Sequence, residues 1–359
     1  MRRALLPLLA TTAIAILLMA PACSMFTEPP PEEDEATFAP GEYGGEPLPE
    51  TEHLYNVVPS PGGDFYALIR AQTPGKSSDP RNQLWIVAQD GSNPDLVGVN
   101  IGTVDWAPNG DTLAVTVAVG IDSFIYTIDL TTGDTTRWSG DESYFFSKPT
   151  AGLPVWFKSG KKLLVSVSQE AYQQPFERGI YTVNTTTKSV SGPLAVLMEA
   201  TYLGNNDRYA IGQKYTYEDS ELSGNFARFD FSDSTVHWIT SFSKDSLRHV
   251  EPPTPSPTSE LIVQSREIQD AEQLFLMNHR GENVRQITER GGDNPRWGDD
   301  GSSFIFRRDV HRGEGARYVP FRFDLETMTA EPLWPALPDS VPDFPDLSTQ
   351  SLDKITPRR

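Results

Sequence analysis

The sequence has only one cysteine, Cys23, in 359 residues. No intramolecular disulfide can form, and a lone thiol in an oxidising compartment is a liability unless it has a dedicated role. Positive charge is also scarce, because 30 lysines and arginines face 49 aspartates and glutamates and the formal net charge is −19. Binding to a phosphate backbone requires a basic surface. The composition therefore excludes a nucleic-acid-binding protein.

The sequence also lacks the common motifs of enzymes. It has no Gly-x-Ser-x-Gly pentapeptide, the nucleophile motif of α/β-hydrolases. The Asp-Gly segments at 90–91 and 300–301 lack the alternating oxygen ligands of a calcium loop, so we interpret them as turns. The five histidines are scattered without the paired spacing of zinc ligands: His53, His237, His249, His279 and His311. The sequence therefore predicts no catalytic residue, no metal site and no cofactor.

The N-terminus has the pattern of an export signal. Met1-Arg2-Arg3 precedes an uncharged apolar run over residues 4–20, which is slightly shorter than the ~20 residues a membrane-spanning helix needs. The segment Ala20-Pro21-Ala22-Cys23 resembles the lipobox of bacterial lipoprotein precursors. This resemblance implies a signal peptide over residues 1–22 and a diacylglycerol on the sulfur of Cys23. The alternatives are an ordinary cleaved signal peptide with an incidental cysteine and an uncleaved membrane anchor.

The segments that flank the central part of the chain have low-complexity compositions. Residues 23–51 are rich in proline and glutamate, so we expect a lipid-anchored tether rather than a packed core. Residues 336–359 are predicted to form a proline-rich tail, which leaves 52–335 as the folded domain. The lipoprotein resemblance, with Ser24 after the cysteine, implies anchoring to the outer membrane, facing the periplasm.

A short pattern recurs six times within residues 52–335. It consists of an aromatic or apolar residue, a turn rich in Pro, Asn, Gly and Asp, and an apolar strand, most clearly at Trp106, 107–111 and 113–117. The first residues of the six copies are Val58, Trp106, Trp156, Tyr202, Thr254 and Trp297. Their spacing lies between 43 and 52 residues, close to the ~40–50 residues of a propeller blade.

A second motif, an alternating strand that usually ends in Asp or Asn, lies in each interval. The copies are at 84–88, 125–129, 180–184, 226–230, 274–278 and 320–324. Asp and Asn at a strand end accept hydrogen bonds from the next backbone groups, so these residues are predicted to form turns rather than to act as acids. Two motifs in phase predict an all-β fold: a six-bladed β-propeller of four-stranded antiparallel blades.

The repeats resemble those of TolB-like propellers. The resemblance rests on Trp-Ala-Pro-Asn-Gly-Asp at 106–111, Ile-Tyr-Thr-Ile-Asp at 125–129 and Val-Arg-Gln-Ile-Thr at 284–288, and it covers all six units. It implies a propeller of a group that includes periplasmic scaffolds, solute-binding propellers and the propeller halves of peptidases. No residues remain for a peptidase's catalytic domain, so we expect no peptidase activity.

Three structural expectations follow from the propeller fold. Residues 53–57 are expected to complete the last blade and close the ring. The three repeat tryptophans are expected to pack between blades, with a ligand surface as the alternative. Long connections where a partner would bind are expected as loops at 72–81, 169–178, 215–225 and 309–317.

One basic cluster stands out in the acidic chain, in the predicted hairpin of the sixth repeat. It consists of Arg307, Arg308, His311, Arg312 and Arg317. These residues either pair with acidic surface groups or contact an anionic partner. They are therefore the candidate binding residues.

The sequence as a whole predicts a monomeric, non-catalytic lipoprotein of the cell envelope whose propeller binds an envelope protein or polymer. One alternative is a propeller enzyme, such as a polysaccharide lyase with residues from several blades in its channel. Another is a purely structural spacer. Capture of a partner without turnover, turnover itself, or neither would distinguish the three.

Overall fold

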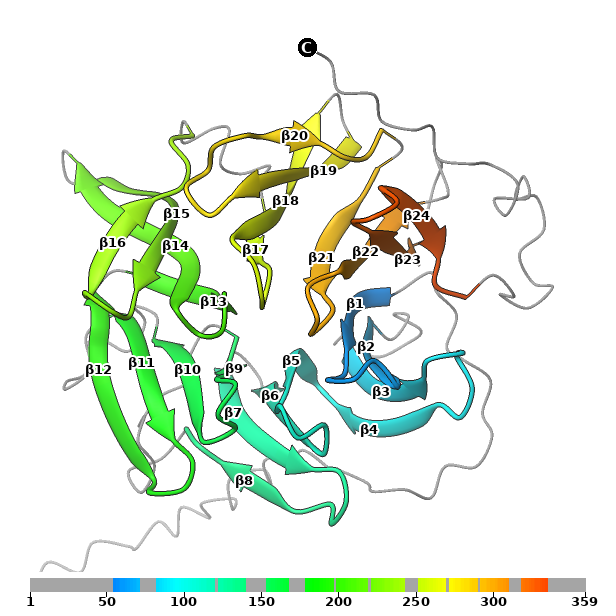
Figure 1. Ribbon diagram of the computed structural model, residues 1–359. Coiled ribbons are helices and arrows are strands. Elements are labelled where there is room, and N and C mark those ends of the chain that lie inside the picture. Colours follow the sequence, from blue (N-terminus) through cyan, green and yellow to red (C-terminus); the bar gives the residue numbers. More distant parts are fainter. Residues whose placement is uncertain are drawn as a thin grey trace, which may run out of the picture. The chain divides into compact units, whose positions relative to one another are not determined.

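The computed structural model describes residues 54–71, 82–119, 122–139, 153–167, 178–196, 198–218, 221–242, 251–268, 271–289, 291–309 and 318–334. Their regular elements are strands, and among them no helix is long and apolar enough to cross a membrane. The strands form six four-stranded antiparallel sheets, which surround a central axis as blades (Figure 1). The predicted six-bladed propeller of four-stranded antiparallel blades is confirmed.

Each blade consists of four consecutive strands, and the first strand lies nearest the axis (Figure 1). Blade 1 contains β1 (Leu54–Pro59), β2 (Phe65–Ala71), β3 (Asn82–Ala88) and β4 (Asp95–Val99), and blade 2 contains β5 (Ile101–Trp106), β6 (Thr112–Val119), β7 (Asp122–Asp129) and β8 (Thr135–Arg137). Blade 3 contains β9 (Val155–Trp156), β10 (Lys162–Val167), β11 (Gly179–Asn184) and β12 (Ser189–Val196), and blade 4 contains β13 (Met198–Gly204), β14 (Tyr209–Glu218), β15 (Glu221–Asp230) and β16 (Thr235–Trp238). Blade 5 contains β17 (Thr254–Pro255), β18 (Leu261–Ile268), β19 (Ala271–Asn278) and β20 (Arg285–Gln286), and blade 6 contains β21 (Asp293–Trp297), β22 (Ser303–Asp309), β23 (Tyr318–Asp324) and β24 (Thr329–Pro332).

The two sequence motifs correspond to fixed strands of each blade. The first motif begins in the innermost strand, and the second motif is the third strand. In every blade, the backbone N–H after the third strand donates to a carbonyl in the turn between the first two strands. The six donor and acceptor pairs are Gln89 to Asp64, Leu130 to Asp111, Thr185 to Lys161, Phe231 to Arg208, His279 to Glu260 and Leu325 to Ser302.

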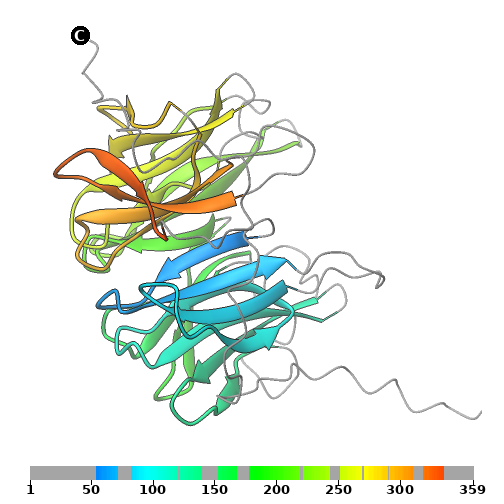
Figure 2. The same cartoon turned by 90° about the vertical axis from the view of Figure 1, so that its right-hand side faces the viewer.

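These bonds place both turns of a blade on the same side of the ring. We name this side the turn face. The strands run back and forth between it and the opposite face, as the side view in Figure 2 shows.

The hydrophobic core is divided among the junctions between blades. Each of the six clusters of buried apolar side chains joins two neighbouring blades. Trp106 is only 6% exposed in the cluster between blades 1 and 2, and its Nε1 donates to the Val58 carbonyl at 3.1 Å. Trp297 makes the equivalent bond to Thr254, at 2.8 Å. The repeat tryptophans therefore pack between blades, as predicted.

The predicted closure by residues 53–57 is wrong. From Leu54 onward this segment belongs to β1, which pairs with β2 in the first blade, and β24 supplies the outer strand of blade 6. The last blade therefore needs no borrowed strand. Side chains join the two blades instead: Trp334 is 6% exposed among apolar groups of blades 1 and 6, and its Nε1 donates to the Gln89 carbonyl at 3.1 Å. Arg322 Nη2 also donates to the Tyr66 hydroxyl at 2.8 Å.

Two predicted loops are also corrected. Residues 215–218 and 221–225 belong to the paired strands β14 and β15, whose backbone ladder continues to Glu218 opposite Glu221. Asp309 ends β22 rather than opening a loop. Residues 72–81, 169–177 and 310–317 lie outside the described residues.

Because side chains join blades 1 and 6 in the described part of the chain, Trp334→Ala should lower the free energy of unfolding by ~3–5 kcal/mol, the usual cost of deleting a buried tryptophan. Trp334→Phe should recover most of this loss. Urea unfolding measures both, and Trp238→Ala, at a side chain that is 47% exposed, is the control expected to change stability by less than ~1 kcal/mol. Equal losses for Trp334→Ala and Trp238→Ala would contradict this account of ring closure.

Candidate functional site: the central channel

The inner strands surround two cavities that follow one another along the axis. The upper cavity, of about 370 Å³, opens between the turns of the turn face, and the lower cavity, of about 490 Å³, lies toward the opposite face. Five residues line both: Leu153, Thr201, Tyr202, Thr254 and Arg296. The two cavities therefore form one central channel with a shared middle.

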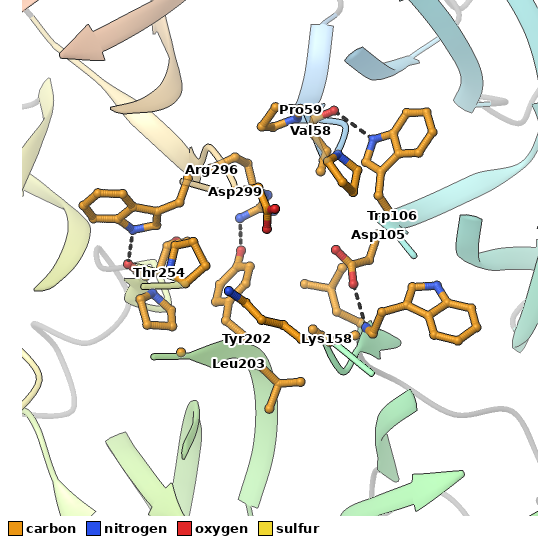
Figure 3. Close-up of a pocket in the computed structure, with 18 of the residues that line it drawn as sticks. Val58, Pro59, Asp105, Trp106, Lys158, Tyr202, Leu203, Thr254, Arg296 and Asp299 are labelled. Carbon is orange, nitrogen blue, oxygen red and sulfur yellow. Dashed lines mark hydrogen bonds between the residues drawn. The ribbon is translucent and has the colours of Figure 1, made fainter. Parts of the chain in front are cut away.

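All six blades contribute to the wall of the upper cavity. Its rim is largely proline from the repeat turns, including Pro61, Pro108 and Pro257. The polar groups Asp105, Tyr202 and Arg296 point into the space between the inner strands (Figure 3). The cavity thus has a rigid, mostly apolar rim with a few convergent polar groups below it, which is the usual construction of a ligand site.

Asp105 is the most strongly perturbed acid of the upper cavity. Burial raises its pKa to about 7, although the Trp156 N–H and the nearby Arg296 charge act in the opposite direction. The Trp156 N–H donates to Asp105 Oδ2 at 2.7 Å and so fixes the carboxyl group across the junction of blades 2 and 3. This carboxyl group changes its charge near neutral pH.

Arg296 and Tyr202 meet in the middle of the channel. The Arg296 guanidinium donates to the Tyr202 hydroxyl, and its centre lies 4.8 Å from the centroid of the Tyr202 ring. Burial lowers the pKa of Arg296 to about 9, an effect that the charge of Asp105 partly opposes. The pair connects blade 6 to blade 4 where the two cavities join.

The rim of the upper cavity carries a second set of charges. The Lys158 backbone N–H donates to Asp207 Oδ2 at 2.6 Å, and Lys158 Nζ donates to Asn206 Oδ1 at 2.8 Å. These bonds join the turns of blades 3 and 4. Asp299 of blade 6 also lines the rim and is exposed.

The lower cavity borders a group of three carboxylates. Ligand oxygens of Glu251, Glu272 and Asp293 lie within 4.8 Å of one another. Burial, together with the charges of Asp293 and Glu251, raises the pKa of Glu272 to about 8. Arg307 donates to both oxygens of Asp293, at 2.8 and 2.6 Å.

These three carboxylates could supply oxygen ligands to a hard cation. Arg307 already neutralises Asp293 through a two-bonded ion pair, and Glu251 Oε2 accepts the Asn294 N–H at 2.9 Å. The group is thus at least partly satisfied by the protein's own donors.

Arg307 and Arg308 of the predicted basic cluster lie within β22, not in the hairpin beyond it. Arg307 lines the lower cavity and also donates to the Leu54 carbonyl at 2.9 Å. Arg308 is 6% exposed, stacks 4.4 Å from the Phe321 ring centroid and donates to the Gly291 carbonyl. His311, Arg312 and Arg317 lie outside the described residues, as does Cys23. A binding role for this cluster stays a prediction.

Sequence reasoning missed Asp105 and Arg296. Each directly precedes a repeat tryptophan in an innermost strand. Side chains alternate along a strand, so the residue before such a tryptophan lies on the opposite face of its blade, and at Asp105 and Arg296 this residue also lines the upper cavity. A charged residue at this position of the repeat was therefore a readable signal of a channel group.

Comparison with solved structures finds proteins of similar fold. TolB from Acinetobacter baumannii matches with a TM-score of 0.53 and 17% sequence identity, over 79% of this chain and 64% of TolB. The fold is that of a TolB-like six-bladed β-propeller. The chain thus spans less than two thirds of TolB's length. No family model matches the sequence, and no curated protein is detectably similar to it.

The structure also matches part of a larger enzyme. The acylaminoacyl peptidase of Pyrococcus horikoshii matches with a TM-score of 0.50 and 10% identity, over 76% of this chain but only 44% of the peptidase. The likeness therefore concerns the propeller fold and leaves the activity open.

The raised pKa of Asp105 predicts a pH-dependent stability. An aspartate in an unfolded chain has a pKa of ~4, so between pH ~4 and about 7 the folded protein holds a proton that the unfolded chain has lost. The stability contributed by neutral Asp105 is therefore complete below pH ~4 and is lost as the pH rises through about 7.

Asp105→Asn, which still accepts the Trp156 N–H but cannot ionise, should gain stability relative to the wild type as the pH rises over this range. Urea unfolding at several pH values measures the difference, with Asp111→Asn at an exposed turn position as the control. A difference for Asp105→Asn that is the same at every pH would contradict the assignment.

Proposed function

We propose that this chain is an exported, non-catalytic lipoprotein of the cell envelope whose propeller binds a protein or another envelope polymer at the turn-face mouth of its channel. The observation that carries the proposal is the upper cavity, because all six blades line it and a proline-rich rim holds it open. A rigid mouth of this kind costs little ordering entropy when a ligand enters. The partner is an envelope protein or polymer, and the protein acts as a monomer.

The anchor at Cys23 and the outer-membrane location belong to the same proposal. They rest on the resemblance of residues 20–23 to a lipobox and on Ser24. A tether over residues 23–51 would let the propeller face the periplasm at some distance from the lipid.

Cys23→Ser should abolish incorporation of labelled fatty acid and transfer the protein from the membrane fraction to the soluble fraction or to an unprocessed form. Fractionation followed by mass measurement of the N-terminal peptide distinguishes these results. The Ser24→Ala variant is the control, since it leaves the modified sulfur in place. Unchanged labelling of Cys23→Ser would remove the anchor from the proposal.

The binding proposal is tested at Asp299, an exposed residue on the rim of the upper cavity. The full chain, solubilised from envelopes in mild detergent, is used to capture partners that mass spectrometry identifies. Asp299→Arg should weaken capture about tenfold or more, since the longer arginine side chain obstructs the mouth of the channel. Asp134→Arg, an exposed turn-face position of blade 2 outside the cavity lining, is the matched control.

Equal capture by the Asp299→Arg and Asp134→Arg variants would exclude the channel mouth as the binding site.

A propeller enzyme is the second candidate, and the perturbed acids of the channel favour it specifically. Asp105 and Glu272 have raised pKa values of about 7 and about 8, and shifted acids are frequent in active sites. Turnover of envelope polysaccharides that Asp105→Asn abolishes would favour the enzyme over the binding module.

A further inference from the structure

Blade 3 has a charge opposite to that of the rest of the protein. Its described residues, 153–167 and 178–196, include four lysines, one arginine and no aspartate or glutamate. The four lysines, out of nine in the whole chain of net charge −19, are Lys158, Lys161, Lys162 and Lys188. All four are exposed.

The four lysines form a row from the channel to the outside of the ring. Lys158 follows the innermost strand β9, Lys161 and Lys162 lie at the start of β10, and Lys188 directly precedes the outermost strand β12. The bond from the Thr185 N–H to the Lys161 carbonyl, 3.0 Å, joins the two turns that carry them. With strands ~4.8 Å apart, the row crosses roughly 14 Å of the turn face. We call it the lysine row.

Few negatively charged side chains of the protein neutralise the lysine row. Lys158 Nζ donates to the neutral Asn206 amide, and no ion pair joins Lys161, Lys162 or Lys188 to another residue in the described part of the chain. Surface lysines in acidic proteins are commonly spread among carboxylates, which offset their charge. The charges of Lys161, Lys162 and Lys188 are thus gathered on one blade without an ion-pair partner among the described residues, whereas the charge of Lys158 acts on the nearby Asp207 and partly opposes the rise in its pKa that burial causes.

Acidic turns elsewhere on the turn face restrict which anion can reach the row. Blades 2 and 4 flank blade 3, and the first turn of blade 4 already places Asp207 beside Lys158. The turns of blades 1, 2 and 6 carry acids and no lysine or arginine: Asp64, Asp90, Asp111, Asp129, Asp134, Asp299, Asp300 and Glu326. A flat anionic surface, such as a membrane, would meet these carboxylates at the same time as the lysines. A narrow, extended chain that lies along blade 3 avoids them.

We propose that the lysine row binds an extended acidic segment of a partner polypeptide, with one end of the segment at the channel mouth beside Lys158. A stretch of about four residues, at ~3.3 Å each, spans the row. The proposal rests on the proposed binding function and specifies two further properties of the ligand: it is negatively charged, and it runs outward from the channel along blade 3. The turn face carries lysines on blade 3 and carboxylates on other blades, and this uneven charge would orient an acidic partner as it approaches.

The test uses fluorescein-labelled hexaglutamate as the probe and fluorescence anisotropy of the full chain at low ionic strength. Lys161→Gln/Lys188→Gln should weaken hexaglutamate binding at least about fivefold, since each exposed ion pair contributes up to ~1 kcal/mol and about 1.4 kcal/mol is tenfold. The matched control Arg208→Gln/Arg280→Gln removes the same charge from exposed turn-face positions of blades 4 and 5 and should change affinity less than about twofold. Added salt should abolish the wild-type binding.

Absence of hexaglutamate binding, or equal loss in both double variants, would overturn the proposal. A second experiment measures how much protein sediments with vesicles of phosphatidylglycerol and phosphatidylcholine. The proposed lipid anchor is the same in all variants, so a difference between variants reports the contribution of the lysines. Vesicle binding that depends on the lysines, without binding of hexaglutamate, would assign the row to a membrane and also overturn the proposal.

The same double variants separate this proposal from the proposed function. A captured partner that is lost with Asp299→Arg but retained with Lys161→Gln/Lys188→Gln leaves the channel mouth as a binding site and removes the lysine row from it. Failure to capture any partner, together with lysine-dependent hexaglutamate binding, would instead count against the envelope function and support the acidic ligand.

Discussion

The structure depends on one constraint: a four-stranded blade cannot cover its own two faces. Each cluster of buried side chains therefore lies between two blades, and no blade contains a complete core of its own. The repeat tryptophans meet this constraint at two junctions in the same way, by donating from Nε1 to the innermost strand of the preceding blade. The alternation that buries Trp106 and Trp297 places the preceding residues, Asp105 and Arg296, on the opposite face of their blades. Both residues line the channel, so the packing of the ring also influences the chemistry of its channel.

The channel contains groups that are costly to bury. Asp105 and Arg296 lie close enough to influence each other's pKa, and each has its pKa shifted toward the neutral form by burial. Tyr202 and the Trp156 N–H satisfy part of their hydrogen-bonding capacity. Purely apolar residues would fill the same positions with less penalty, so these polar groups are better explained by the proposed binding function of the channel than by its stability.

Much of the fold could be predicted from the sequence, because the repeat is a consequence of strand and turn chemistry. Proline, glycine and asparagine at the turns and alternating apolar strands determine where each blade begins and where its third strand ends. Ring closure was not predictable in this way: whether residues 54–57 or 329–332 complete the last blade depends on contacts between segments far apart in the chain. The role of Arg307 was also hidden, since its partner Asp293 lies in another strand of the blade. The lysine row could not be predicted from the sequence either, because its four residues become neighbours only once the radial order of the strands is known.

Closure by side chains has a consequence for the order in which the protein folds. Other junctions join blades that are consecutive in the chain, so they can form progressively during synthesis. The contacts of Trp334 with Gln89 and of Arg322 with Tyr66 join residues 245 and 256 positions apart. They have the highest cost in loop-closure entropy, and they cannot form before both terminal blades exist. Until that last step, the apolar faces of blades 1 and 6 remain in water, so the seam between them is the part of this protein with the greatest need of protection while the chain is being completed.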